Sequence, residues 1–103
     1  MITKIQKAAW GQSQIVDASH LFVFANQITI KDSEIDSFID NTSITRGIEK
    51  EKLAGYQGFM KSKINELSDD AINIWNSKQT YLALANLLNA AAELKIDVTP
   101  MEG

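Results

Sequence analysis

The stretch from Ser68 to Gly103 constrains what this chain can fold into more than any other part of the sequence. Ser68 is a good helix N-cap, and Asp69 and Asp70 place negative charge in the first turn, where the helix dipole favours it. Strong helix formers follow as far as Leu94, and no Gly or Pro interrupts them. The stretch is therefore predicted to form one long helix, a short extended segment and a final Pro-Met-Glu-Gly sequence.

Residues 79–92 of this predicted helix carry no formal charge, and their leucines point to more than one side. A surface helix keeps one charged face, so the pattern predicts a helix that is buried in a core. A thin polar seam recurs at roughly helical spacing and is formed by Gln79, Asn86, Asn89 and Glu93. Amides inside an apolar helix need hydrogen-bond partners, which could come from a neighbouring loop, a ligand or a second subunit.

At 103 residues the chain has room for one small domain. Its net charge of −3 argues against nucleic acid as a partner. The sequence contains no Cys, which excludes disulfides and Cys-based metal sites. No apolar run reaches the roughly 18 residues that a membrane helix needs, and the first residues lack the apolar core of a signal peptide. We therefore expect a cytoplasmic protein that binds neither nucleic acid nor a membrane.

Residues 20–25 form a nearly continuous apolar run, which is typical of a strand covered on both faces. Such a strand needs partners along both edges, and the only candidates are residues 27–30 and 96–99. The expected class is therefore α+β: mostly helical, with one clear strand and the long buried central helix. One strand with so few partners indicates a piece of a larger sheet.

The other helices are predicted from apolar spacing between breakers, at residues 2–10, 15–18, 31 to about 43, and 49–67. For the third of these helices, Asp32 or Ser33 is the expected cap. The fourth combines an apolar stripe with a charged opposite face. Helices are therefore expected to dominate the chain.

Residue chemistry alone identifies no active site. The sequence has no Gly-rich phosphate loop, no cluster of metal ligands and no Ser-His-Asp spacing. The only histidine, His20, stands at the start of the predicted strand, where a structural role is the commoner one. Trp75, Tyr81 and Phe59 are by default core aromatics. No catalytic residue and no metal site are therefore predicted.

Three motifs nevertheless carry a resemblance to a known family. They are D-A-S-H running into L-F-V-F at residues 17–24, W-x-x-K-Q-x-Y-L at residues 75–82, and D-V-T-P-M-E-G at residues 97–103. In order and spacing they resemble the FMN-dependent nitroreductase family, in particular its oxygen-insensitive NAD(P)H nitroreductase and dihydropteridine reductase branch. The similarity covers nearly the whole chain and is weakest over residues 31–67.

The resemblance implies a homodimeric α+β flavoprotein that binds FMN at the subunit interface. It also implies two-electron hydride transfer from NAD(P)H, through FMN, to a nitroaromatic or quinone acceptor. Residues 1–103 would then form a single, partial nitroreductase-like domain. Within it, residues 31–67 would be a helical excursion over the active-site channel, and residues 68–103 the central helix and flavin-edge segment.

The resemblance also implies contacts with the flavin and with a substrate. The segment that lies against the flavin ring matches Pro100, Met101, Glu102 and Gly103, where backbone N–H groups would stabilise the reduced ring. A loop that reaches the pyrimidine edge of the ring matches the segment with Gly11, Gln12 and Gln14. The wall of the substrate channel matches the region of Tyr56, Phe59 and Met60, for which ordinary packing is the alternative.

The family's Arg-x-Ser-x-Lys segment, which grips the flavin phosphate, has no counterpart in this sequence. Its Asn-x-Gln-Pro-Trp region has none either. We therefore expect an internal fragment, about half of a nitroreductase, which lacks the phosphate clamp needed to bind FMN tightly and is not expected to be active on its own. The alternative is a non-catalytic helical module that has no cofactor and dimerises through its long apolar helix.

Overall fold

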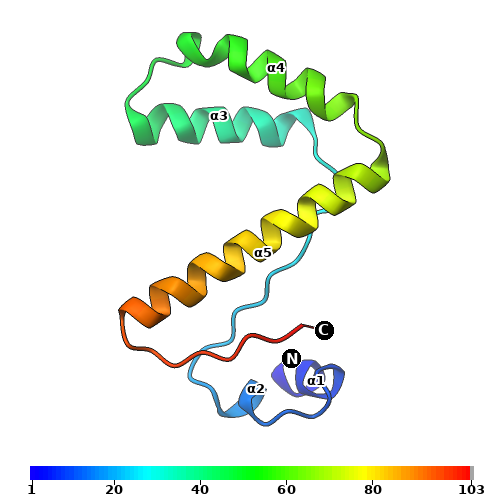
Figure 1. Cartoon of the computed structure of the whole chain (residues 1–103), viewed down its shortest axis with the longest axis vertical. Coiled ribbons are helices and arrows are strands. Elements are labelled where there is room, and N and C mark those ends of the chain that lie inside the picture. The colour runs from blue at the N-terminus through cyan, green and yellow to red at the C-terminus, as the bar shows by residue number, and fades with distance from the viewer. Residues whose placement is uncertain (103) are drawn as a thin grey trace. The chain divides into compact units, whose positions relative to one another are not determined.

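The computed structural model describes residues 1–102, in which the chain forms helices and connecting segments (Figure 1). In chain order the helices are α1 (Ile2–Ala8), α2 (Gln14–Asp17), α3 (Asp32–Arg46), the 3₁₀ helix η1 (Lys50–Leu53), α4 (Ala54–Asn65) and α5 (Asp69–Glu93). The chain divides into two compact units. We call Met1–Ala25 with the residues from Gln79 onward the terminal unit, and Asn26–Lys78 the central unit.

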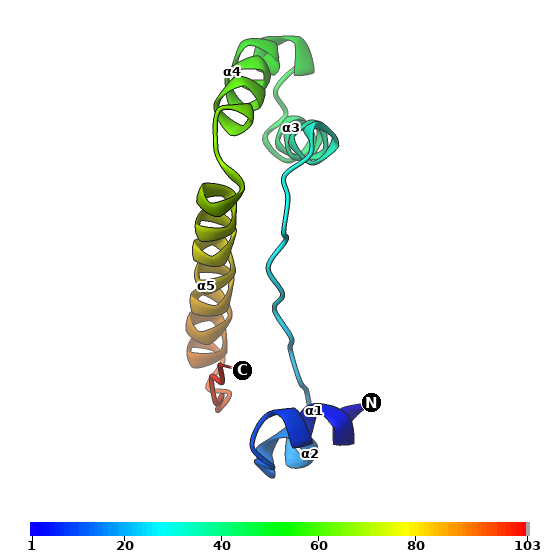
Figure 2. The same cartoon turned by 90° about the vertical axis from the view of Figure 1, so that its right-hand side faces the viewer.

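Helices α3 and α4 lie side by side as a hairpin in the central unit (Figures 1 and 2). Apolar burial in this unit centres on Ile35 and on Ile39, whose side chain is fully inaccessible. Full burial of one such side chain contributes roughly 1.5–3 kcal/mol. Beside them, the Asp36 carboxylate accepts hydrogen bonds from Lys61 Nζ and Gln57 Nε2, each over 2.6 Å. These bonds tie α3 to α4.

The ends of α3 differ from the prediction at both caps. The N-cap is Lys31, whereas Asp32 and Ser33, the predicted caps, lie further along the chain. The Lys31 backbone N–H donates to the Glu34 carboxylate over 2.6 Å, which is one half of a capping box. At the other end α3 continues past the predicted end near residue 43, and Gly47 terminates it in the left-handed conformation, with φ of 63°.

Helix α5 forms over nearly its whole predicted length, with residues 69–78 in the central unit and the rest in the terminal unit. The Ala71 backbone N–H donates to Ser68 Oγ over 3.3 Å, which confirms Ser68 as the N-cap. The predicted burial of α5 is wrong. Large apolar side chains such as Ile74 and Leu82 are exposed, because a helix that is apolar all round buries only the faces that a neighbouring element covers.

The predicted strand at residues 20–25 is also wrong, and with it the α+β class, because residues 1–102 contain no strand. The proposed partners at residues 27–30 and 96–99 form no ladder with it, and the segment is a connecting stretch without regular secondary structure. Phe22 and Val23 are 63% and 70% exposed. A strand requires backbone hydrogen bonds to a neighbour as well as a β-prone sequence, and this chain supplies only the sequence.

In the terminal unit a tight turn joins α1 to α2. Trp10 and Gly11 both adopt left-handed backbone conformations, with φ of 56° and 72°. The Gly11 backbone N–H donates to the Gln6 carbonyl over 2.8 Å and closes the turn. Ile15 of α2 is buried, and α1 and α2 pack against each other.

The C-terminal end of α5 reverses the chain. Lys95 takes the left-handed conformation, with φ of 58°, and its N–H donates to the Ala92 carbonyl. The Ile96 N–H donates to the Ala91 carbonyl over 2.8 Å, so that the pair of bonds makes a Schellman motif. Residues 96–102 then run as extended chain, which we call the tail. None of the helices in residues 1–102 is long and apolar enough to cross a bilayer.

Candidate functional site

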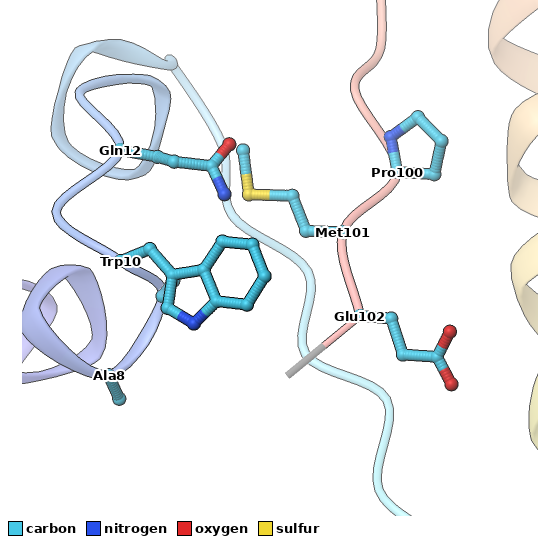
Figure 3. Close-up of a pocket in the computed structure, with 7 residues that line it drawn as sticks. Ala8, Trp10, Gln12, Pro100, Met101 and Glu102 are labelled. Carbon is cyan, nitrogen blue, oxygen red and sulfur yellow. The ribbon is translucent and has the colours of Figure 1, made fainter.

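The first residues of the chain and the tail form one pocket within the terminal unit (Figure 3). Its volume is about 290 Å³. This volume is at the lower edge of the roughly 300–1,000 Å³ that is usual for small-molecule sites. The lining residues come from the end of α1, the turn after it and the tail, and are Ala8, Ala9, Trp10, Gln12, Pro100, Met101 and Glu102.

The side chains of the tail point alternately to opposite sides. In Figure 3 the Met101 thioether points toward the Gln12 amide, and the Trp10 indole lies beside them. The Glu102 carboxylate points away from Gln12 and Trp10. Such alternation is the geometry of an extended chain. The tail therefore presents the Met101 thioether, and not the Glu102 carboxylate, to Gln12 and Trp10.

The turn after α1 brings some of the expected flavin-contacting residues to this pocket. Gln12 lines it and is half-buried. Gly11 supplies the left-handed turn, and Gln14 is exposed in the first position of α2; neither lines the pocket. Gly103 lies outside the described residues.

The Glu102 carboxylate has a specific partner on α5. Tyr81 Oη donates a hydrogen bond to Glu102 Oε1. This bond, together with the charge of the carboxylate, raises the pKa of Tyr81 above its usual value of 10.0. Tyr81 is half-exposed, so it is not the core aromatic that the sequence predicted. The bond connects the tail to the long helix.

The three predicted channel-wall residues lie on α4 in the central unit. Tyr56 and Phe59 are exposed, and Met60 is half-buried. Exposure argues against simple core packing for the two aromatics. Their role as a substrate-channel wall stays a prediction.

The lining suits a flat aromatic ring better than a phosphate. The Trp10 indole and the Met101 thioether offer polarizable apolar surface, and the Gln12 amide offers both a donor and an acceptor. No Lys or Arg is among the described residues that line the pocket. Within residues 1–102 there is also no group of three acidic or histidine side chains that could hold a metal ion.

Reasoning from the sequence missed Trp10 and Tyr81. Trp10 directly precedes Gly11, and both residues form the left-handed turn after α1. The turn places Trp10 in the lining of the pocket. Tyr81 belongs to the W-x-x-K-Q-x-Y-L motif, but its bond to Glu102 depends on the tail folding back along α5. The turn could be predicted from Gly11, whereas nothing in the sequence predicted that the tail would fold back after α5.

Comparison with curated proteins finds relatives that match nearly the whole chain. A Bacillus subtilis protein with the provisional name NAD(P)H nitroreductase YfkO is 34% identical over 97% of this chain and 48% of its own length. The major NAD(P)H-flavin oxidoreductase of Aliivibrio fischeri is 32% identical over 91% of this chain and 44% of its own. A provisionally named NAD(P)H nitroreductase of Haemophilus influenzae is 34% identical over 97% of this chain and 47% of its own.

The chain thus spans about half the length of the curated relatives that it matches. No protein-family model matches the chain. No solved structure matches it significantly either. The similarity therefore rests on the curated sequences.

Proposed function

The chain belongs to the nitroreductase family, and from that premise we propose that its pocket holds the ring of FMN in an NAD(P)H-dependent nitroreductase or quinone reductase. The observation that carries the proposal is the meeting of two distant segments. Gln12 near one end of the sequence and residues 100–102 near the other line the same pocket. The same family resemblance implies flavin contact for both segments.

The lining residues have distinct roles in this proposal. The Gln12 amide hydrogen-bonds a carbonyl or ring nitrogen at the polar edge of the flavin. Met101 and Trp10, which is 93% exposed, offer apolar surface to the faces and edge of the ring. Bound FMN supplies the hydride chemistry that connects NAD(P)H to a nitroaromatic or quinone acceptor. Among the described residues, the pocket has no Lys or Arg to pair with the phosphate, and the proposed contact is therefore with the ring.

A titration of the purified chain with flavins tests the proposal. We expect saturable quenching of flavin fluorescence in the micromolar range. Because no Lys or Arg is found in the described part of the lining, riboflavin should bind within about tenfold of FMN, a difference of no more than about 1.4 kcal/mol. Gln12→Ala should weaken binding of both flavins equally, and Gln27→Ala, in the central unit, serves as the matched control. If neither FMN nor riboflavin fluorescence were quenched by the chain, the result would contradict the proposal.

Activity needs its own assay. If the chain catalyses the proposed reaction, NADH or NADPH consumption should depend on both added FMN and a nitroaromatic or quinone acceptor. Consumption that is independent of the flavin would contradict the assignment. The cytoplasmic location is part of the same proposal.

A second candidate function is a dimerisation module without a cofactor. The exposed apolar side chains of α5, including Ile74, Trp75 and Leu82, favour self-association. Homodimerisation is compatible with both candidates, and the flavin titration separates them. A dimer in sedimentation that binds no flavin would favour the module, whereas a strictly monomeric folded chain would count against both.

A further inference from the structure

We propose that Tyr81 is a positioning residue of the pocket: its phenol holds the Glu102 carboxylate on the α5 side of the tail, so that Met101 rather than Glu102 faces Gln12. The geometry is a property of the terminal unit itself. Its relevance to flavin binding rests on the function proposed above.

The lengths of the two segments fit this role. Between Tyr81 and the end of α5 at Glu93 the helix rises about 18 Å. The extended residues 96–102 span about 20 Å in the opposite direction. After the reversal at Lys95, the tail therefore returns Glu102 to the level of Tyr81, where the hydrogen bond forms.

The bond also determines which side of the tail faces the pocket. Neighbouring residues of an extended chain point to opposite sides, so fixing Glu102 toward α5 turns Met101 toward Gln12 (Figure 3). Without the bond, rotation of the tail could bring the carboxylate to the pocket instead. That would replace a neutral wall by a negative charge.

The charge matters because of what the pocket is proposed to hold. A flavin ring becomes more electron-rich on reduction, and a carboxylate beside it would oppose that change. Among the residues that the structure describes, the lining contains no Lys or Arg that could offset the carboxylate. Tyr81 therefore contributes by keeping the single acidic side chain of the lining directed away from the ring.

The test is made on the full chain without any flavin, so that its outcome is independent of the function proposed above. In spectra of protein labelled at the methionine methyl groups, we expect a nuclear Overhauser effect between the Met101 methyl and the Gln12 side-chain amide. Tyr81→Phe should lower the equilibrium constant for forming this contact by about twofold to tenfold, the loss expected for one net hydrogen bond. Tyr56→Phe removes the other phenol, which is equally exposed at 52%, and should leave the contact unchanged.

Variants at Glu102 separate positioning from general damage to the helix. Glu102→Ala leaves α5 untouched and should lower the contact as far as Tyr81→Phe does, with no further loss in the double variant. Glu102→Gln keeps an acceptor for the phenol and should retain most of the contact. A contact that persists in Tyr81→Phe, or that falls in Glu102→Gln as far as in Glu102→Ala, would overturn the proposal. Circular dichroism of each variant checks that α5 is still helical.

Discussion

The side-chain amide of Asn76 donates a hydrogen bond to the backbone carbonyl of Gln27 over 2.7 Å, and it thereby ties α5 to the extended segment that leads into α3. Asn76 is 5% exposed and is the buried polar residue of the described core. The sequence predicted that amides of the long helix would need hydrogen-bond partners. It assigned this need to the polar seam that begins at Gln79, whose residues are exposed in the structure. The partnered amide lies instead one turn earlier, within the central unit.

Loss of the Asn76 amide should destabilise the central unit. Asn76→Ala removes the donor and leaves a backbone carbonyl in a partly buried place, which costs about 1–3 kcal/mol. Asn73→Ala, at an exposed position of the same helix, should change the free energy of unfolding by less than about 0.5 kcal/mol. Urea unfolding of both variants measures the difference. Equal effects would show that the Asn76–Gln27 bond contributes nothing specific.

The left-handed residues that follow α5 and α3 predict opposite changes in stability when Gly is introduced after α5 and removed after α3. Lys95 holds a left-handed conformation that Gly adopts more easily, so Lys95→Gly should stabilise the fold by about 0.5–1 kcal/mol. Gly47 occupies the equivalent position after α3, and Gly47→Ala should cost about 1 kcal/mol. No heavy atom lies within 4 Å of a Cβ built on Gly47, so the cost is conformational rather than steric. The midpoint temperature of thermal unfolding should rise for Lys95→Gly and fall for Gly47→Ala.

The α3–α4 hairpin should weaken in acid through Asp36. The hydrogen bonds from Lys61 and then Gln57 hold the pKa of this carboxyl below its ordinary value of 3.8. A carboxyl whose folded pKa is lowered adds stability above its unfolded pKa, and loses it as pH falls through the folded value. The contribution should thus be present above about pH 4 and disappear below it.

Asp36→Asn and Lys61→Met should both flatten this acid dependence, because each removes one partner of the ion pair. The acid dependence is measured by following the helical circular dichroism signal as pH is lowered at constant ionic strength. An acid transition of unchanged depth in both variants would contradict the assignment to Asp36.

The Tyr81–Glu102 bond predicts a shift at the alkaline end. The hydrogen bond to the carboxylate raises the pKa of Tyr81, so its stabilising effect is complete below pH 10.0 and is lost as pH rises through the raised value. In Tyr56→Phe, Tyr81 is the remaining tyrosine, and its ionisation can be followed by ultraviolet absorbance. Adding Glu102→Gln should lower the measured pKa. An unchanged pKa would show that the bond does not form in solution.

The helices could be predicted because their signals are local. The N-cap at Ser68 and the left-handed stop at Gly47 depend on residues within a few positions of each helix end. The strand at residues 20–25 could not be judged in the same way, since a ladder depends on a distant partner. The burial of α5 failed for a related reason: apolar composition tells what a helix could bury, and other elements decide what it does bury.

The candidate site was partly predictable. The resemblance pointed to Gln12 and to residues 100–102, and the structure brings these residues together. It gave no sign that Trp10 lines the pocket, a place that follows from two consecutive left-handed residues. Tyr81 is part of a motif that carries the resemblance, but its bond to Glu102 depends on a chain reversal. Both depend on backbone geometry that a motif does not encode.

The most direct test of the proposed flavin site is a titration of methionine-methyl-labelled chain with riboflavin. The sequence has three methionines, at Met1, Met60 and Met101, which gives one probe in the pocket and one on α4. Ring currents from a flavin bound in the pocket should shift the Met101 methyl signal saturably, with the same affinity as the fluorescence quenching. A Met101 signal that stays fixed while flavin fluorescence is quenched would place the flavin elsewhere and contradict the account.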